Sequence, residues 1–141
     1  MSATQLAALA RTSDPRTMLR RFLALDAVVT GANAAAYLAV SGPLGDLFDV
    51  DAHLLLILGA FLAVYAAGVG LLASRPHPAI LPVRLVVEGN LAWAVLSLLA
   101  LALWLTPSTA GAVWTVLQAL TVAGFAALQH MALKARQDTS S

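Results

Sequence analysis

Four segments of this sequence are long enough to cross a membrane and contain at most one charged residue each. They cover residues 22–40, 52–73, 85–105 and 111–133. A helix needs about 20 mostly apolar residues to cross the ~30 Å hydrocarbon core of a bilayer. Backbone groups inside lipid must hydrogen-bond internally, and no alternating apolar and polar pattern indicates strands, so helices are the consistent interpretation. The sequence therefore predicts four transmembrane helices.

The composition indicates that lipid is the main solvent of this chain. Hydrophobic residues make up 60% of the 141 residues and charged residues 11%, against roughly 45–50% and 25% in an ordinary soluble domain. We expect one all-α membrane domain over residues 1–141, an antiparallel four-transmembrane-helix bundle with flanking segments at 1–21 and 134–141. The first ~15 residues and residues 137–141 are expected to be loosely attached or disordered.

The breaks between the apolar segments agree with this division. Ser41-Gly42-Pro43 is expected to end the first helix, and Asp49 or Asp51 can cap the second. Three prolines between residues 74 and 83 interrupt continuous helix. Residues 106–109 form a predicted tight turn whose Ser or Thr can cap the fourth helix.

The basic residues give the predicted bundle an orientation. All eight of them flank the end that would carry both chain termini, whereas the opposite loops contain none and the first of those loops carries three aspartates. By the positive-inside rule, the N- and C-termini are predicted to be cytoplasmic, and Trp104 and Trp114 are expected at the outer interface. The basic residues are Arg11, Arg16, Arg20, Arg21, Arg75, Arg84, Lys134 and Arg136.

Polar and aromatic side chains inside the predicted spans are the candidate ligand-binding residues. A charged side chain at the bilayer centre costs about 2.5–3.5 kcal/mol on insertion scales, so it usually faces the bundle interior or water. On the first span, Asp26, Thr30, Asn33 and Tyr37 follow helical spacing and form one polar stripe. The full candidate set is Asp26, Thr30, Asn33, Glu88, Asn90, Trp93, Gln118, Gln129 and His130.

The predicted topology places four of these side chains at a similar depth. Asp26, Glu88, Gln129 and His130 all lie about one turn from the basic end of their spans. Together with the stripes on the first, third and fourth spans, they predict an amphipathic cleft that opens toward the cytoplasmic leaflet. A small amphipathic molecule or lipid would bind or be transported there, with Asp26 as its polar anchor.

Structural roles also explain the same residues, and they are the default for the amides, Glu88 and His130. Glu88 lies four residues after Arg84, so the two can pair along the helix surface. His130 can sit at the interface near Lys134. The buried amides, and Asp26 itself, can be interhelical hydrogen-bond partners worth about 0.6 kcal/mol per bond. The alternative hypothesis is therefore a structural or accessory membrane subunit.

The sequence contains no motif that predicts an enzyme, and we expect no catalytic residue, cofactor or metal site. Phosphate-binding glycine loops, HExxH and GxSxG are absent, and there is no cysteine. The net charge of +1 does not indicate nucleic acid as a partner. Small residues at four-residue spacing, such as Gly59, Ala63 and Ala67, allow close helix packing. They can serve the bundle itself or a homo-oligomer, and self-association is favoured because four short spans bury little surface alone.

Two stretches carry a resemblance to known proteins. LALDAVVTGANAAAYLAV (Leu23–Val40) and AGAVWTVLQALTVAGFAALQ (Ala110–Gln129) resemble an uncharacterised group of small four-helix integral membrane proteins of high-GC bacteria. The architecture is also loosely similar to DoxX-like proteins and to small multidrug exporters, which carry a membrane-embedded acid in the first helix. The resemblance implies a four-helix fold and a multi-pass location in the bacterial inner membrane. It transfers no active site.

Overall fold

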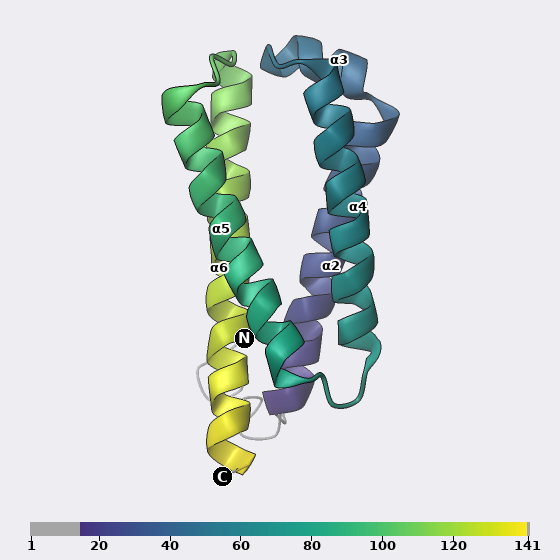
Figure 1. Cartoon of the computed structure of the whole chain (residues 1–141), viewed down its shortest axis with the longest axis vertical. Helices are drawn as coiled ribbons and strands as arrows, with labels where there is room; N and C mark the ends of the chain where they lie inside the picture. The colour runs from purple at the N-terminus through teal and green to yellow at the C-terminus, as the bar shows by residue number, and fades with distance from the viewer. Residues whose placement is uncertain (1–14, 141) are drawn as a thin grey trace, which may run out of the picture.

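The computed structural model describes the backbone of residues 15–140 and the side chains of residues 15–138. This part of the chain consists of helices and short connections and has no strand (Figure 1). The helices are α2 (Pro15–Ala39), α3 (Ser41–Phe48), α4 (Ala52–Ser74), α5 (Ile80–Leu103) and α6 (Thr109–Ser140). All except α3 are long and apolar enough to cross a membrane. The predicted all-α fold with four spans is confirmed, whereas the expectation of disorder before residue 15 lies outside the described residues.

Two of the predicted helix caps are present. The Asp51 side chain accepts a hydrogen bond from the His53 backbone N–H at 2.9 Å and caps α4. Ser108 Oγ accepts from the Gly111 N–H at 3.2 Å at the start of α6. Both side chains supply an acceptor to backbone N–H groups that have no partner within the helix.

The helices extend beyond several of the predicted boundaries. α5 begins at Ile80 rather than Leu85, because Pro82 falls in its first turn, where a backbone N–H would have no intrahelical acceptor. α6 continues to Ser140, so residues 137–140, which were expected to be loosely attached or disordered, are helical. Polar residues at a helix end outside the apolar span still continue the backbone ladder of hydrogen bonds.

The short helix α3 is not predicted by the apolar pattern. The Ser41-Gly42-Pro43 sequence does end α2, but it then starts a new helix instead of a loop, with Pro43 in the first turn. α3 ends at Phe48, and the next residue, Asp49, has a left-handed φ of 54°. Aspartate is one of the few residues that adopt this conformation readily. α3 thus redirects the chain across the end of the bundle into α4.

The four long helices form two hairpins that converge at one end (Figure 1). α2 packs along α4, and α5 packs along α6. The hairpins meet in the closed half of the bundle, which we define as residues 15–30, 63–74, 80–90 and 126–140, and they separate toward α3. Residues 31–62 and 91–125 form the open half. α4 and α5 are consecutive in the chain, yet they make little contact with each other.

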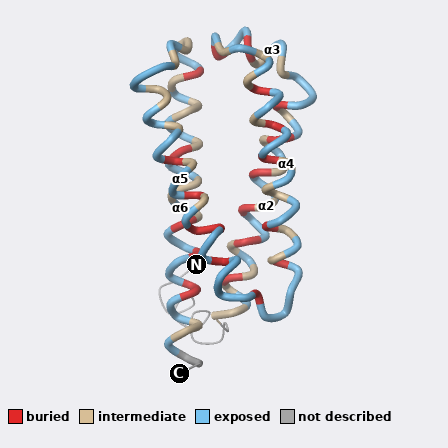
Figure 2. The backbone as a smooth tube through the Cα atoms, viewed as in Figure 1, coloured by how far each residue is buried: buried red, intermediate tan, exposed pale blue. Residues whose placement is uncertain are grey.

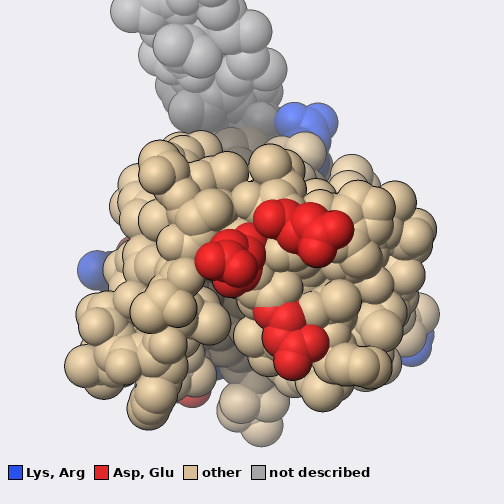
Figure 3. Space-filling view, turned by 90° about the horizontal axis from the view of Figure 1, so that it is seen from above, with Lys and Arg blue, Asp and Glu red and all other residues tan. Residues whose placement is uncertain are grey.

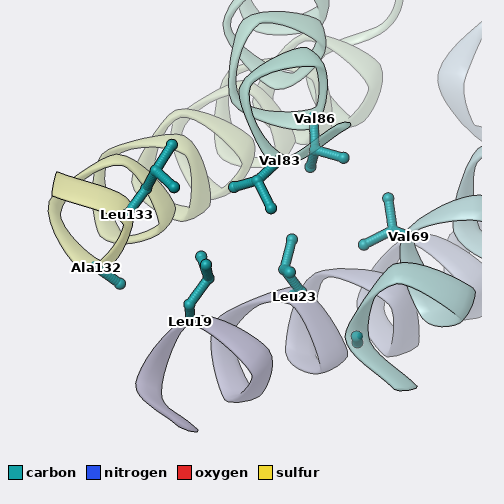
Figure 4. Packing of buried hydrophobic residues seen from close by; sticks show 8 residues of the cluster. Leu19, Leu23, Val69, Val83, Val86, Ala132 and Leu133 are labelled. Atoms are coloured by element: carbon teal, nitrogen blue, oxygen red, sulfur yellow. The ribbon is translucent and has the colours of Figure 1, made fainter. Parts of the chain in front are cut away.

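All four long helices contribute to the apolar core of the closed half. Figure 4 shows Leu23, Val69 and Val83, from three different helices, pointing toward one another. Arg20 Nε donates to the Ala73 carbonyl oxygen at 3.0 Å and ties α2 to the end of α4. The core residues are Leu19, Leu23, Val69, Ala73, Val83, Val86, Ala132 and Leu133.

The open half has a core that comes mainly from one hairpin. Its cluster of buried apolar residues consists of Ala34 and Tyr37 of α2 and Leu55 and Leu62 of α4. The buried residues of α5 end at Ala94, so the last third of this helix has none. The α5–α6 hairpin therefore covers the α2–α4 hairpin only partly in this half.

Large aliphatic side chains cover the outside of the bundle, which is pale blue along its length in Figure 2. Val28 is 69% exposed and Val64 is 75% exposed. Contiguous apolar surface of this extent is not tolerated in water. These four helices are compatible with an integral, multi-pass membrane protein, and their outer faces then contact the lipid bilayer.

The two ends of the bundle differ in charge. Asp46, Asp49 and Asp51 are exposed in and after α3, and Figure 3 shows acidic side chains gathered on that end. The described basic residues belong to the opposite end, where α2 starts, α4 connects to α5, and α6 ends. The predicted segregation of basic residues at one end is therefore present in the described part of the chain.

Candidate functional site

Four polar residues form a fully enclosed group at the boundary between the closed and open halves. We call Asp26, Thr30, Asn90 and Gln129 the Asp26 cluster. Asp26 and Gln129 are 0% exposed, and the other two are buried. All four belong to the predicted site set, and they come from α2, α5 and α6.

The Asp26 carboxylate accepts hydrogen bonds from the other three members of the cluster. Its Oδ2 accepts from Asn90 Nδ2 at 2.7 Å and from Gln129 Nε2 at 2.8 Å. Its Oδ1 accepts from Thr30 Oγ1 at 3.0 Å. Asn90 Nδ2 also donates to Gln129 Oε1 at 3.0 Å. The carboxylate is thus surrounded by neutral donors from three helices.

Tyr65 connects α4 to the cluster. Its hydroxyl lies 2.9 Å from Asn90 Oδ1 and 3.0 Å from the Val86 carbonyl oxygen, so it donates to acceptors on α5. Within the described residues, no buried side-chain nitrogen or oxygen lacks a hydrogen-bond partner. Because an unpaired polar group in a low-dielectric interior costs about 1–3 kcal/mol, a fully paired network favours this one arrangement of the four helices.

A cleft begins directly above the Asp26 cluster and extends into the open half. Its first cavity has a volume of about 220 Å³, with Thr30 and Asn90 at its floor. Asn33, Trp93 and Gln118 line its walls. The five predicted residues that face this cavity come from α2, α5 and α6. Asp26 does not line it, because its own hydrogen-bond donors lie between the carboxylate and the cavity.

A second cavity of about 320 Å³ continues the cleft toward α3. Phe48, Leu58 and Trp114 are among its lining residues. The cleft therefore occupies the open half, and the expectation that it opens at the basic end is wrong because the apolar core of four helices fills that end. The two cavities share Tyr37, Trp93, Leu96 and Gln118.

Aromatic rings bridge the two hairpins along the cleft. Phe61 of α4 stacks on Trp93 of α5 with ring centroids 5.9 Å apart and an interplanar angle of 5°. Phe61 is 54% exposed, so this pair stands where α4 and α5 face the outside. Trp93 Nε1 donates to Gln118 Oε1 at 2.7 Å, which fixes the indole against α6.

The far end of the cleft is closed by contacts between α3 and α6. Phe48 and Trp114 stack with centroids 6.0 Å apart, and the Ser108 N–H donates to the Phe48 carbonyl oxygen at 2.9 Å. Trp114 Nε1 donates to the Tyr37 hydroxyl at 2.8 Å. Trp114 thus faces the cleft, unlike Trp104, which is 74% exposed and matches the expected interfacial position better.

Two predicted site residues take no part in the cluster or the cleft. Glu88 and His130 are both exposed on the outer surface of their helices, and neither lines either cavity. Of the four side chains predicted at one depth, only Asp26 and Gln129 meet. Depth follows from topology, but the direction of a side chain around its helix depends on how that helix packs.

Sequence reasoning missed Tyr65, Phe61 and Phe48. Tyr65 gave the clearest signal, because it is one of two tyrosines in the chain and the one polar side chain beyond the first turn of the second predicted span. Phe61 lies one helical turn before it. Nothing in the sequence distinguishes these phenylalanines from lipid-facing ones, so their contact with tryptophans becomes visible only in the packed structure.

The described residues include no group of three or more His, Cys, Asp or Glu side chains arranged to hold a metal ion. Searches of protein-family profiles, of curated proteins and of solved structures find nothing that matches this chain. The candidate function therefore depends on the geometry of the cleft and of the Asp26 cluster.

Proposed function

We propose that this chain is a multi-pass protein of the bacterial inner membrane that binds a small amphipathic molecule or lipid in the cleft of its open half. The observation that carries the proposal is the continuous cleft, with cavities of about 220 and 320 Å³, between two hairpins whose outer faces are apolar. Small-molecule sites are typically concave and mostly apolar, with a few polar groups that orient the ligand. The proposed relatives are the small four-span membrane proteins of high-GC bacteria.

The position of the cleft suits a ligand that arrives from the bilayer. α4 and α5 make little contact with each other, and the exposed Phe61 ring covers Trp93 between them. With the basic end in the cytoplasm, as the positive-inside rule favours, the cleft lies in the outer half of the membrane. A molecule dissolved in that leaflet reaches the cleft laterally without crossing an aqueous phase.

Binding is favoured over passage through the bundle. Below the cleft the Asp26 cluster spans α2, α5 and α6, and the apolar core beneath it draws on all four long helices. A molecule moving toward the basic end would have to break both. The proposed protein therefore presents or retains its ligand, and transport would require a large separation of the hairpins.

A structural or accessory role is the second candidate, and the Asp26 cluster favours it. Every member of the cluster is hydrogen-bonded to another member, as expected of side chains that hold helices together. This observation concerns the closed half and does not account for the cleft. If the protein is only a scaffold, bulk lipid fills its cleft without selection. If it is a binding protein, one kind of molecule occupies the cleft selectively.

Mass spectrometry of molecules retained by the purified protein tests the proposal. Ala100 lines the second cavity, whereas Ala102 is exposed on the same helix and lines neither. We expect the natural sequence and Ala102→Phe to retain the same lipid or amphiphile, and Ala100→Phe to lose it. If all three proteins retain the same molecules in the same proportions, the cleft is not the binding site.

A further inference from the structure

The described residues that line the cleft include no Asp, Glu, Lys, Arg or His side chain. The side chains around both cavities are amides, hydroxyls, aromatic rings and aliphatic groups. Moving an unpaired charge from water into such surroundings is strongly unfavourable. A ligand with a permanently charged head would find no counter-ion there.

Asp26 is the nearest candidate for a counter-ion to a cationic ligand, and it is not available. Its carboxylate accepts from Thr30, Asn90 and Gln129 and is completely buried behind two of them. A cation that reached it would have to displace amide donors, which would then be left without acceptors in an apolar interior. The predicted role of Asp26 as a direct ligand anchor is therefore replaced by a role in holding the floor of the cleft.

Neutral hydrogen-bonding groups remain unused in the first cavity. Asn33 lines it, and its side chain makes no hydrogen bond with any described residue. The Tyr37 hydroxyl accepts from Trp114, which leaves its own hydrogen free to donate. Gln118 uses Nε2 for one bond, to the Thr115 carbonyl oxygen at 3.2 Å, and has a second hydrogen. These groups can both donate to and accept from an uncharged head.

The second cavity supplies the apolar remainder of the site. Leu54, Leu55 and Leu58 line it on the α4 side, and Trp114 lies at its α3 end. From this arrangement we infer that the cleft selects an uncharged lipid whose head carries a hydroxyl or carbonyl group. The head lies beside Asn33, and the apolar chain extends toward α3. This inference rests on the proposed function and adds the charge class and the orientation of the ligand.

Three matched probes test the charge class. They are a mid-chain-brominated stearyl alcohol, the corresponding alkyl sulfate and the corresponding alkyl trimethylammonium, added to the protein in lipid nanodiscs. Bromine quenches tryptophan on contact, and Trp93 and Trp114 line the cleft. The Trp104→Phe background removes the exposed reporter. Quenching is compared with that of the Ala100→Phe protein, which corrects for probe dissolved in the bilayer.

In the protein that keeps Ala100, we expect the alcohol to quench the fluorescence of Trp93 and Trp114. Its apparent affinity should be about tenfold or more above that of either charged probe, because the charged heads would be unpaired in the cleft. Ala100→Phe is expected to abolish the excess quenching. Asn33→Leu should lower the apparent affinity for the alcohol about threefold to tenfold, because one hydrogen-bonding group is lost, and should leave the affinity for the charged probes unchanged. Asn33 makes no hydrogen bond that the described part of the chain would lose, so this variant should fold normally.

Two other outcomes are distinguishable. If a charged probe quenches as well as the alcohol, or better, and Ala100→Phe still removes the effect, the inference about charge is wrong while the proposed function stands. If no probe quenches more than it does in Ala100→Phe, both the inference and the proposed function fail. If Asn33→Leu leaves the affinity of the alcohol unchanged, the assigned position of the head is wrong.

Discussion

The closed and open halves of the bundle contain the same four helices but differ in what holds them together. In the closed half, four helices share an apolar core and the Asp26 cluster. In the open half, the core is mainly that of the α2–α4 hairpin, and the other hairpin touches it through individual aromatic contacts. In lipid the hydrophobic effect does not drive helices together, so packing and interhelical hydrogen bonds decide where they close.

This difference explains how one short chain can be both stable and hollow. A network of buried polar groups concentrated at one level fixes the relative positions of the hairpins. The helices can then diverge beyond that level without losing their register. The polar residues of the closed half would thus be structural, whereas the polar residues that remain unpaired in the open half are the candidates for ligand contact.

The largest expected effect is a difference in stability between two leucine substitutions on α2, one in each half of the bundle. Asp26→Leu removes the acceptor of three hydrogen bonds and leaves the Asn90 and Gln129 amides partly unpaired. We expect the free energy of unfolding to fall by about 3 kcal/mol. Asn33→Leu removes no hydrogen bond and should change it by less than about 0.5 kcal/mol. Reversible unfolding in mixed micelles measures both.

Equal losses from these two variants would contradict the division into halves. A large loss from Asn33→Leu alone would mean that the unpaired amide of the open half has a structural role that the geometry does not show. Asp26→Asn provides a finer control, because it keeps the size of the side chain while replacing one accepting oxygen by a donor. Its expected loss lies between those of the two leucine variants.

A smaller effect is expected where the open half is closed by α3. A Cβ atom added at Gly111 would lie 2.5 Å from the Phe48 carbonyl oxygen and 2.8 Å from Pro107 Cβ. Gly111→Ala should therefore separate α3 from α6 and cost about 1–2 kcal/mol. Gly124→Ala on the same helix meets nothing within 4 Å and should be neutral or stabilising by up to about 1 kcal/mol. Thermal unfolding in detergent compares the two.

Equal behaviour of the two alanine variants would mean that close contact at Gly111 does not hold α3 against α6. Increased access of water-soluble quenchers to Trp114 in Gly111→Ala would support this role of Gly111, because Trp114 stacks on Phe48 at this contact. Gly124→Ala should leave that access unchanged.

The smallest expected effect concerns the link from α4 to the cluster. Tyr65→Phe removes the bond to Asn90 and Val86 and should cost about 0.6 kcal/mol, the average for interhelical hydrogen bonds in a membrane. Measured again in the Asp26→Leu background, the same change should cost less, because Asn90 is then no longer held in place. Full additivity of the two losses would show that Tyr65 acts independently of the cluster.

The fold was predictable because length, apolar content and charge distribution are properties of whole segments. The spans, the segregation of basic residues and the Asp51 and Ser108 caps all follow from local patterns. α3 was not predicted, because its eight residues are too few to span a membrane and contain a proline that usually suggests a break. The early start of α5 was hidden by Pro82 for the same reason.

The site was predictable only in part. The polar stripe from Asp26 to Asn33 correctly marked the inner face of α2, and Asn90 and Gln129 were found on the partner helices. Glu88 and His130 were chosen by depth alone, and their outward direction depends on the rotation of α5 and α6, which no single segment determines. The side of the Asp26 cluster on which the cleft opens depends on the splay of two hairpins.

The central claim, that the hairpins are closed at the basic end and separated toward α3, can be tested by distance measurements between spin labels. The chain has no cysteine, so introduced pairs are unique. Leu71 and Leu81 are exposed on α4 and α5 in the closed half, and Ile57 and Leu99 are exposed on the same helices in the open half. We predict a clearly longer distance between Ile57→Cys and Leu99→Cys than between Leu71→Cys and Leu81→Cys. Equal distances would mean that α4 and α5 run side by side along their length, and that the cleft does not exist.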